Sequence, residues 1–117
     1  MLSIDPLLDR VSTREYNCWD FVVEAWLHIT GDDLSPRMPE LHGTFDRRKI
    51  SVQGARQFKR LAAPESPCLA FMERPRDEPH IGVYYLGRIL HLPSNSMPEY
   101  QTLRVAMRAF KTVRWYK

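Results

Sequence analysis

The sequence predicts an α+β protein, in which helices come first along the chain and an antiparallel sheet follows. The first observation is an apolar stripe with helical spacing between residues 18 and 30. The second is a change of pattern after residue 67, where short runs of β-branched and aromatic residues are separated by turns. A group of helices followed by a group of strands is typical of the α+β class.

The composition favours a soluble globular protein and argues against several other classes. The chain has 117 residues and a mass of 13.8 kDa, so we expect one domain over residues 1–117. Its 44% hydrophobic and 26% charged residues argue against a coiled coil, a collagen or a disordered tail. We expect no membrane span and no secretory signal peptide, because no apolar run approaches the required ~18–20 residues and the N-terminus lacks a basic and an apolar region.

The first helix is predicted to run from Cys18 to Thr30. Asn17 precedes it as a candidate N-cap, and Gly31 follows where a left-handed residue commonly ends a helix. Its apolar face is formed by residues at positions i, i+3, i+4, i+7, i+8 and i+11, namely Cys18, Phe21, Val22, Ala25, Trp26 and Ile29.

The remaining elements are predicted from chain breakers and from strand-like runs. Residues 32–50 contain repeated breakers and are expected to be loop. A second helix is expected over residues 51–61, where apolar residues fall at helical spacing. A short helix is expected within residues 98–110. Strands are expected at residues 68–72, 80–86, 89–92 and 112–116, with the second and third joined in a hairpin.

The two cysteines, Cys18 and Cys68, are too few for a disulfide framework, and no C-x-x-C pair indicates a zinc site. The sequence permits a single disulfide bond between Cys18 and Cys68 but does not require it. On one interpretation, Cys18 is a buried core residue, as free cysteines often are. On the other, backbone N–H groups and the helix dipole at the first turn lower the pKa of its thiol, so that Cys18 acts as a nucleophile.

Four histidines are candidates for the base that such a nucleophile needs. His28 lies about 15 Å further along the same helix, and His42 lies in the predicted loop. His80 and His91 fall on the two strands of the predicted hairpin, almost opposite one another. A histidine that faces a polar partner across a hairpin has the geometry of a base with its orienting residue. The alternative for each is a half-exposed strand residue.

Three segments resemble motifs of the NlpC/P60 cysteine peptidases, most closely the branch associated with phage tails. Residues 16–22 (YNCWDFV) resemble the nucleophile motif, and residues 80–87 (HIGVYYLG) resemble the strand that carries the general base. Residues 89–91 (ILH) resemble the following strand with its third polar residue. The resemblance implies a papain-like fold, in which an N-terminal helix that carries the cysteine packs on an antiparallel β-sheet.

Residue by residue, the resemblance implies Cys18 as the nucleophile, His80 as the general base and His91 as the residue that orients it. Tyr16 is the candidate for the phenol that the family places ahead of its cysteine. Trp19 points off the apolar face of the helix and is a candidate wall of the substrate cleft. This chemistry requires neither a metal nor another cofactor.

The chain departs from the family pattern around the cysteine. Asn17 replaces the usual Asp, and Asp20 takes the position of a usual Gly. An acid one turn into the helix is expected to raise the pKa of the Cys18 thiol. These departures leave open an enzyme of altered specificity or an inactive descendant.

The resemblance implies hydrolysis of amide bonds in peptidoglycan stem peptides. The expected setting is the virion: a phage tail-tip component, made in the bacterial cytoplasm, that acts on the cell wall with tail proteins as partners. The alternative is a catalytically inactive structural or wall-binding module of a tail assembly. Nucleic-acid binding is not expected, because the net charge is only +3 and the densest basic cluster, residues 47–49, has three charges.

Overall fold

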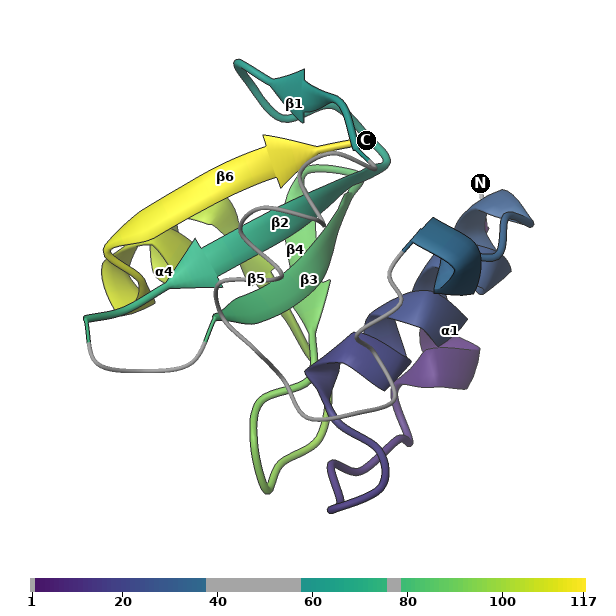
Figure 1. Cartoon of the computed structure of the whole chain (residues 1–117). Helices are drawn as coiled ribbons and strands as arrows, with labels where there is room; N and C mark the ends of the chain where they lie inside the picture. The colour runs from purple at the N-terminus through teal and green to yellow at the C-terminus, as the bar shows by residue number, and fades with distance from the viewer. Residues whose placement is uncertain (1, 38–57, 76–78) are drawn as a thin grey trace.

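In the computed structural model, α1 (Cys18–Thr30) packs on one face of a six-stranded antiparallel sheet and α4 (Leu103–Ala109) packs on the other (Figure 1). The structure describes residues 2–37, 58–75 and 79–117. The predicted α+β class is therefore confirmed. Two 3-10 turns, η1 (Asp5–Leu7) and η2 (Ser35–Arg37), flank α1. The strands are β1 (Arg60–Leu61), β2 (Cys68–Glu73), β3 (His80–Tyr85), β4 (Arg88–His91), β5 (Glu99–Thr102) and β6 (Thr112–Tyr116).

The first helix has the limits that the sequence predicts. At its N-terminus, the Asn17 side-chain oxygen accepts hydrogen bonds from the backbone N–H groups of Trp19 (2.9 Å) and Asp20 (3.3 Å). The Asp20 carboxylate accepts in turn from the Asn17 backbone N–H at 3.0 Å, which completes a capping box. At the other end, Gly31 has a φ of 78° and its N–H donates to the Leu27 carbonyl. These local contacts place Cys18 at the first helical residue.

The sheet has the strand order β1-β6-β2-β3-β4-β5, with every neighbouring pair antiparallel. β3 and β4 form the predicted hairpin. Its two turn residues, Leu86 and Gly87, have φ values of 52° and 88°. Two positive φ angles in a two-residue turn match the right-handed twist of the flanking strands. The hairpin therefore holds His80 and His91 on adjacent strands.

Side chains alternate along the strands and divide the core into two layers. The layer towards α1 contains Leu69, Phe71, Ile81, Val83, Tyr85, Leu90 and Tyr116 from the sheet. The layer towards α4 contains Cys68, Ala70, Met72, Ile89 and Trp115 from the sheet. By the same alternation, His80 and His91 start on the α4 side, where Phe110 lies between α4 and β6.

Three expectations about secondary structure need correction. Residues 51–57 of the expected second helix lie outside the described residues, and its last two residues, Arg60 and Leu61, form β1 against Tyr116 and Trp115. Within the expected loop, residues 38–50 lie outside the described residues and residues 35–37 form η2. β5 was not expected. In each case, cross-strand pairing or a local turn outweighs the helical or coil pattern of the segment.

The expected strands at residues 68–72, 80–86, 89–92 and 112–116 are confirmed as β2, β3, β4 and β6, with limits that differ by at most a residue. The expected short helix is α4, which begins only at Leu103, where the Thr102 hydroxyl accepts from the Val105 N–H. In the part of the chain that the structure describes, no helix has both the length and the apolar content to cross a membrane.

Candidate active site

Cys18 and His80 line one cavity of about 150 Å³ at the N-terminus of α1. Its remaining walls come from the chain around α1 and from the segments that flank β3 and β4, namely Ser12, Asn17, Trp19, Pro79, Leu92 and Ser94. Cys18 is partly buried and carries a free thiol. The structure thus brings the predicted nucleophile and the predicted base to the same hollow, from residues that are far apart in the sequence.

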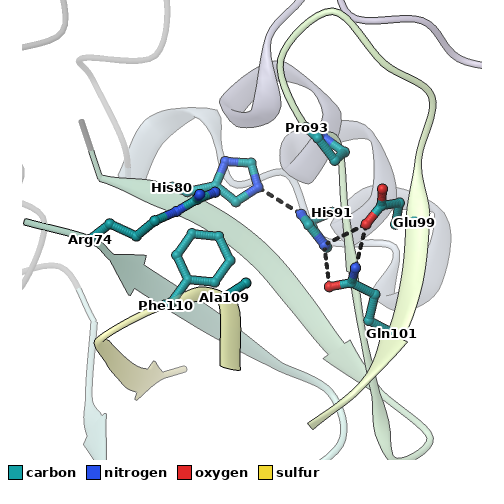
Figure 2. A pocket seen from close by; sticks show the side chains of 8 residues that line it. All are labelled: Arg74, His80, His91, Pro93, Glu99, Gln101, Ala109 and Phe110. Atoms are coloured by element: carbon teal, nitrogen blue, oxygen red, sulfur yellow. Dashed lines mark hydrogen bonds and ion pairs between the residues drawn. The ribbon is translucent and has the colours of Figure 1, made fainter. Parts of the chain in front are cut away.

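His80 and His91 form a direct hydrogen bond, with 2.8 Å between Nε2 of His80 and Nδ1 of His91 (Figure 2). The two rings are nearly perpendicular, at 81°, with centroids 4.9 Å apart. On β4, His91 pairs with Gly82, so the two histidines are diagonal neighbours across the hairpin. A glycine at this point leaves room beside His91 because it has no Cβ. The hydrogen bond lets one ring fix the orientation of the other.

A second pair of polar side chains continues the contact beyond His91. The Nε2 of His91 lies 2.9 Å from the Gln101 side-chain oxygen and 3.7 Å from a Glu99 carboxylate oxygen. The Gln101 amide nitrogen donates to the same Glu99 oxygen. Both residues belong to β5, which sequence patterns did not predict. The sequence did contain one signal for this strand face: Glu99 and Gln101 are polar and two positions apart, and such residues lie on the same face of a strand.

His80 also lines a second cavity of about 220 Å³, on the α4 side of the sheet. Phe110 stacks on the His80 ring at 5.7 Å with only 5° between the planes, and the Arg74 guanidinium lies 4.7 Å from the centre of the Phe110 ring (Figure 2). The cavity is lined by Arg74, His80, His91, Pro93, Glu99, Gln101, Ala109 and Phe110. His80 is the residue that lines both cavities.

Burial keeps both histidines neutral. It lowers the pKa of His80 to about 3, and the neighbouring His91 and Arg74 lower it further in the same direction. Burial also lowers the pKa of His91, against the opposing effects of Gln101 and Glu99. At neutral pH each ring therefore carries a single proton.

The Cys18 thiol has a raised pKa of about 11, mainly because burial disfavours the thiolate. Backbone N–H groups of Ile81, Cys18 and Trp19 act in the opposite direction, and the Asp20 carboxylate adds to the rise. The expectation that the helix start lowers this pKa is wrong, because desolvation outweighs the amides. The Asp20 carboxylate raises the pKa of the Cys18 thiol, as the sequence predicts.

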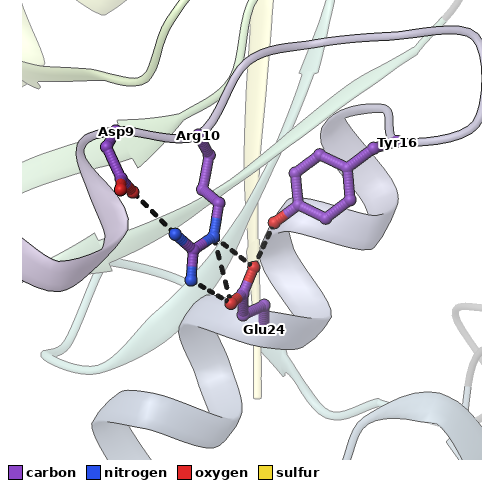
Figure 3. A network of polar contacts seen from close by, with 4 residues as sticks. All are labelled: Asp9, Arg10, Tyr16 and Glu24. Carbon is purple, nitrogen blue, oxygen red and sulfur yellow. Dashed lines mark hydrogen bonds and ion pairs between the residues drawn. The ribbon is translucent and has the colours of Figure 1, made fainter.

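Tyr16 does not contribute to the Cys18 cavity. Its hydroxyl donates to Glu24 of α1, and Arg10 donates to the same carboxylate through Nε (3.0 Å) and Nη2 (2.7 Å) (Figure 3). Asp9 accepts from the other terminal nitrogen of Arg10. Among the described residues, Tyr16 is absent from the lining of the cavities that contain His80. This network connects the N-terminal segment to α1. It does not support the predicted contact of Tyr16 with substrate.

Trp19 lines the Cys18 cavity, as expected for a wall of the cleft, but only 5% of it is exposed. Its ring meets Phe71 edge to face, with centroids 5.8 Å apart. Most of the indole is therefore core, and only its margin faces the cavity.

The remaining candidates lie elsewhere. His28 Nε2 is 2.7 Å from the Ser3 carbonyl oxygen, and His42 lies outside the described residues. Cys68 is buried in the α4 layer with a free thiol, so it forms no bridge with Cys18. Within residues 2–37, 58–75 and 79–117, no group of three or more His, Cys, Asp or Glu side chains is arranged to hold a metal ion.

Comparisons of the chain with protein-family models, with curated proteins and with solved structures found no match.

Proposed function

We propose that the protein is a cysteine peptidase or amidase, with Cys18 as the nucleophile, His80 as the general base and His91 as the residue that orients His80. The observation that carries this proposal is the shared cavity of Cys18 and His80, with His91 hydrogen-bonded to Nε2 of the His80 ring. A thiol at a helix N-terminus beside an oriented imidazole is an arrangement suited to acyl transfer.

The reaction would proceed in two halves. The free ring nitrogen of His80 takes the thiol proton as the Cys18 sulfur attacks the amide carbonyl, and the Cys18 backbone N–H stabilises the oxyanion. His80 then delivers the proton to the leaving amine, which leaves a thioester on Cys18. Water attacks the thioester and loses a proton to His80, and the carboxylic acid departs as that proton returns to the sulfur.

The neutral resting state sets a condition on this mechanism. With the Cys18 pKa raised and the His80 pKa lowered by burial, the pair at rest is a thiol beside a neutral imidazole. Proton transfer therefore accompanies the attack, and no thiolate–imidazolium pair is formed beforehand.

The proposed substrate is the stem peptide of peptidoglycan, and the proposed setting is a phage tail tip in the virion. Both rest on the resemblance of residues 16–22, 80–87 and 89–91 to NlpC/P60 peptidases. The finer fold assignment, a papain-like NlpC/P60 domain, belongs to the same proposal. It is supported by a cysteine-bearing helix packed on an antiparallel sheet with the histidines on its hairpin.

The test is incubation of purified sacculi with the protein and with Cys18→Ala, followed by measurement of newly released amines. We expect release by the unmodified protein and none by Cys18→Ala. Cys68→Ala is the matched control, since this second free thiol is buried in the opposite layer, and it should retain activity. Equal lack of release by all three proteins would refute the hydrolase proposal.

A second candidate function is an inactive structural or wall-binding module of a tail assembly. The raised pKa of the Cys18 thiol favours it, because few thiolates exist at neutral pH. This candidate predicts that the protein binds sacculi without releasing amines, and that Cys18→Ala binds equally well in a pelleting assay. Amine release that depends on Cys18 would exclude it.

A further inference from the structure

We propose that Glu99 and Gln101 of β5 are positioning residues, which fix the proton arrangement of the two histidines so that Nδ1 of His80 is the unprotonated nitrogen. The catalytic meaning of this inference rests on the proposed function, whereas the proton arrangement itself does not. A chain of hydrogen bonds runs from Glu99 through Gln101 and His91 to His80.

The first step is the orientation of the Gln101 amide. A carboxylate can only accept hydrogen bonds, so the Gln101 group that faces Glu99 must be the amide nitrogen. The amide oxygen of Gln101 is then directed at His91, 2.9 Å from its Nε2. Glu99 therefore orients the Gln101 amide so that its oxygen faces His91.

The second step is the tautomer of His91. Its Nε2 faces two acceptors, the Gln101 oxygen at 2.9 Å and a Glu99 oxygen at 3.7 Å. Because both neighbouring oxygens can only accept hydrogen bonds, Nε2 of His91 must carry a proton. Because burial lowers the pKa of His91 and keeps the ring neutral, its Nδ1 has no proton and is an acceptor.

The third step is the tautomer of His80. His80 Nε2 lies 2.8 Å from the unprotonated Nδ1 of His91, so His80 Nε2 must be the donor. The opposite tautomer would set two lone pairs against each other at that distance. The single proton of the neutral His80 ring is thereby used, and its Nδ1 keeps a lone pair that can accept the proton of a thiol.

The position of these residues suits a supporting role. His91 is only 4% exposed, and Phe110 stacks on the His80 ring, so both rings are held by packing as well as by hydrogen bonds. Glu99 and Gln101 lie on the last strand of the sheet order and line the cavity on the α4 side, away from the cavity that contains Cys18. Neither residue lines the Cys18 cavity, so their effect passes through His91.

The experiment is nitrogen-15 NMR of the histidine rings in the full chain at neutral pH, where the two nitrogen shifts distinguish the tautomers. We expect His80 and His91 both to be protonated on Nε2. The double variant Glu99→Leu/Gln101→Met removes both acceptors at similar size. The Nδ1-protonated fraction of His91 should then rise about tenfold, since a hydrogen bond with a charged partner contributes on the order of one factor of ten.

Gln101→Glu is the matched conservative variant, because its carboxyl group keeps an acceptor oxygen towards His91 and, by sharing one proton with the Glu99 carboxylate, keeps a donor towards Glu99. It should retain the tautomers of the unmodified protein. If the double variant fails to fold by its amide spectrum, Glu99→Gln replaces it: a Gln at position 99 can accept or donate, so the Gln101 amide loses its fixed orientation and a mixture of tautomers should appear.

Two results would overturn the inference: a His91 ring protonated on Nδ1 in the unmodified protein, or tautomers that stay unchanged in the double variant or, where that variant does not fold, in Glu99→Gln. In hydrolysis assays, the double variant should lose at least about tenfold in kcat with little change in KM, whereas Gln101→Glu should retain most of the kcat of the unmodified protein. If the tautomers respond as expected but sacculi stay intact with the unmodified protein, the hydrogen-bond assignment stands and the proposed function fails.

Discussion

Asn17 and Asp20 depart from the NlpC/P60 pattern, and the structure supplies a physical reason for both. They are the two halves of a capping box, each bonded to the backbone of the other. The spacing N-x-x-D is itself a sequence signal for this motif. The same contact holds a carboxylate near Cys18, where it raises the pKa of the thiol. At this residue pair, helix stability and thiol reactivity have opposite requirements.

Asp20→Asn should lower the pKa of Cys18, because it removes the negative charge while an amide oxygen at position 20 still accepts from the Asn17 N–H. The measurement is the rate of Cys18 alkylation by iodoacetamide between pH 7 and 11, in a Cys68→Ala background. In the unmodified protein the rate should keep rising up to about pH 11. A midpoint that is unchanged or higher in Asp20→Asn would contradict the role assigned to this carboxylate.

Tyr16→Phe should lower the free energy of unfolding by roughly 1 kcal/mol, because the half-buried hydroxyl loses its bond to Glu24. Urea denaturation provides the measurement. Alkylation of Cys18 and release of amines from sacculi should stay at the level of the unmodified protein, since Tyr16 does not line the Cys18 cavity. A loss of hydrolysis with unchanged stability would instead support the substrate contact that the family resemblance implies.

At the scale of the elements, the β3–β4 hairpin depends on a close approach of backbones at Gly82. A Cβ on this residue would lie 2.8 Å from the Ile89 side chain, 2.9 Å from the Leu90 carbonyl oxygen and 3.1 Å from the Cβ of His91. The backbone of β4 cannot yield without moving His91. The glycine of the H-x-G segment therefore maintains the distance between the two histidines.

Gly82→Ala should destabilise the protein by about 1–3 kcal/mol through overpacking, and it should weaken the His80–His91 hydrogen bond. Urea denaturation measures the first effect, and the nitrogen-15 shifts of the rings report the second. Gly87→Asn is the comparison variant: nothing lies within 4 Å of a Cβ there, so its cost is only the strain of a side chain at positive φ, which Asn bears better than most residues. Equal stability of the two variants would show that the hairpin adapts to the extra carbon.

At the scale of the whole molecule, a single aromatic cluster joins the start of α1 to the centre of the sheet. Phe71 of β2 meets Trp19 at 5.8 Å, Tyr116 at 4.8 Å and Phe58 at 6.5 Å, all edge to face. Trp19 follows Cys18 directly, so this packing sets the depth at which the thiol lies. The burial that raises the pKa of Cys18 and lowers that of His80 is thus a property of the assembled layers.

Acid should destabilise the protein through His80. Burial lowers the folded-state pKa of His80 to about 3, below its ordinary 6.5, so between these values the unfolded chain binds a proton that the folded chain does not. Above about pH 6.5, His80 is neutral in both states and does not change the free energy of unfolding with pH. As the pH falls from 6.5 towards 3, this one group lowers the free energy of unfolding by about 1.4 kcal/mol per pH unit.

The measurement is urea denaturation between pH 7 and 4 for the unmodified protein and for His80→Gln, which keeps a donor for His91. The stability of the variant should fall less steeply with acid. Because the pKa of His91 is also lowered by burial, part of the slope should remain. Identical slopes would contradict the neutral, buried state of His80.

Local signals were sufficient for α1 with both of its ends and for the β3–β4 hairpin, because caps, apolar spacing and turn residues act over a few neighbouring positions. They also singled out Cys18, His80 and His91: in the folded chain Cys18 and His80 line one cavity, and His80 and His91 line another. Packing between distant segments decided the rest. Arg60 and Leu61 became strand through pairing with β6, and Glu99 and Gln101 reached His91 through pairing with β4. The raised pKa of the Cys18 thiol likewise follows from burial, to which every layer contributes and which no stretch of sequence contains.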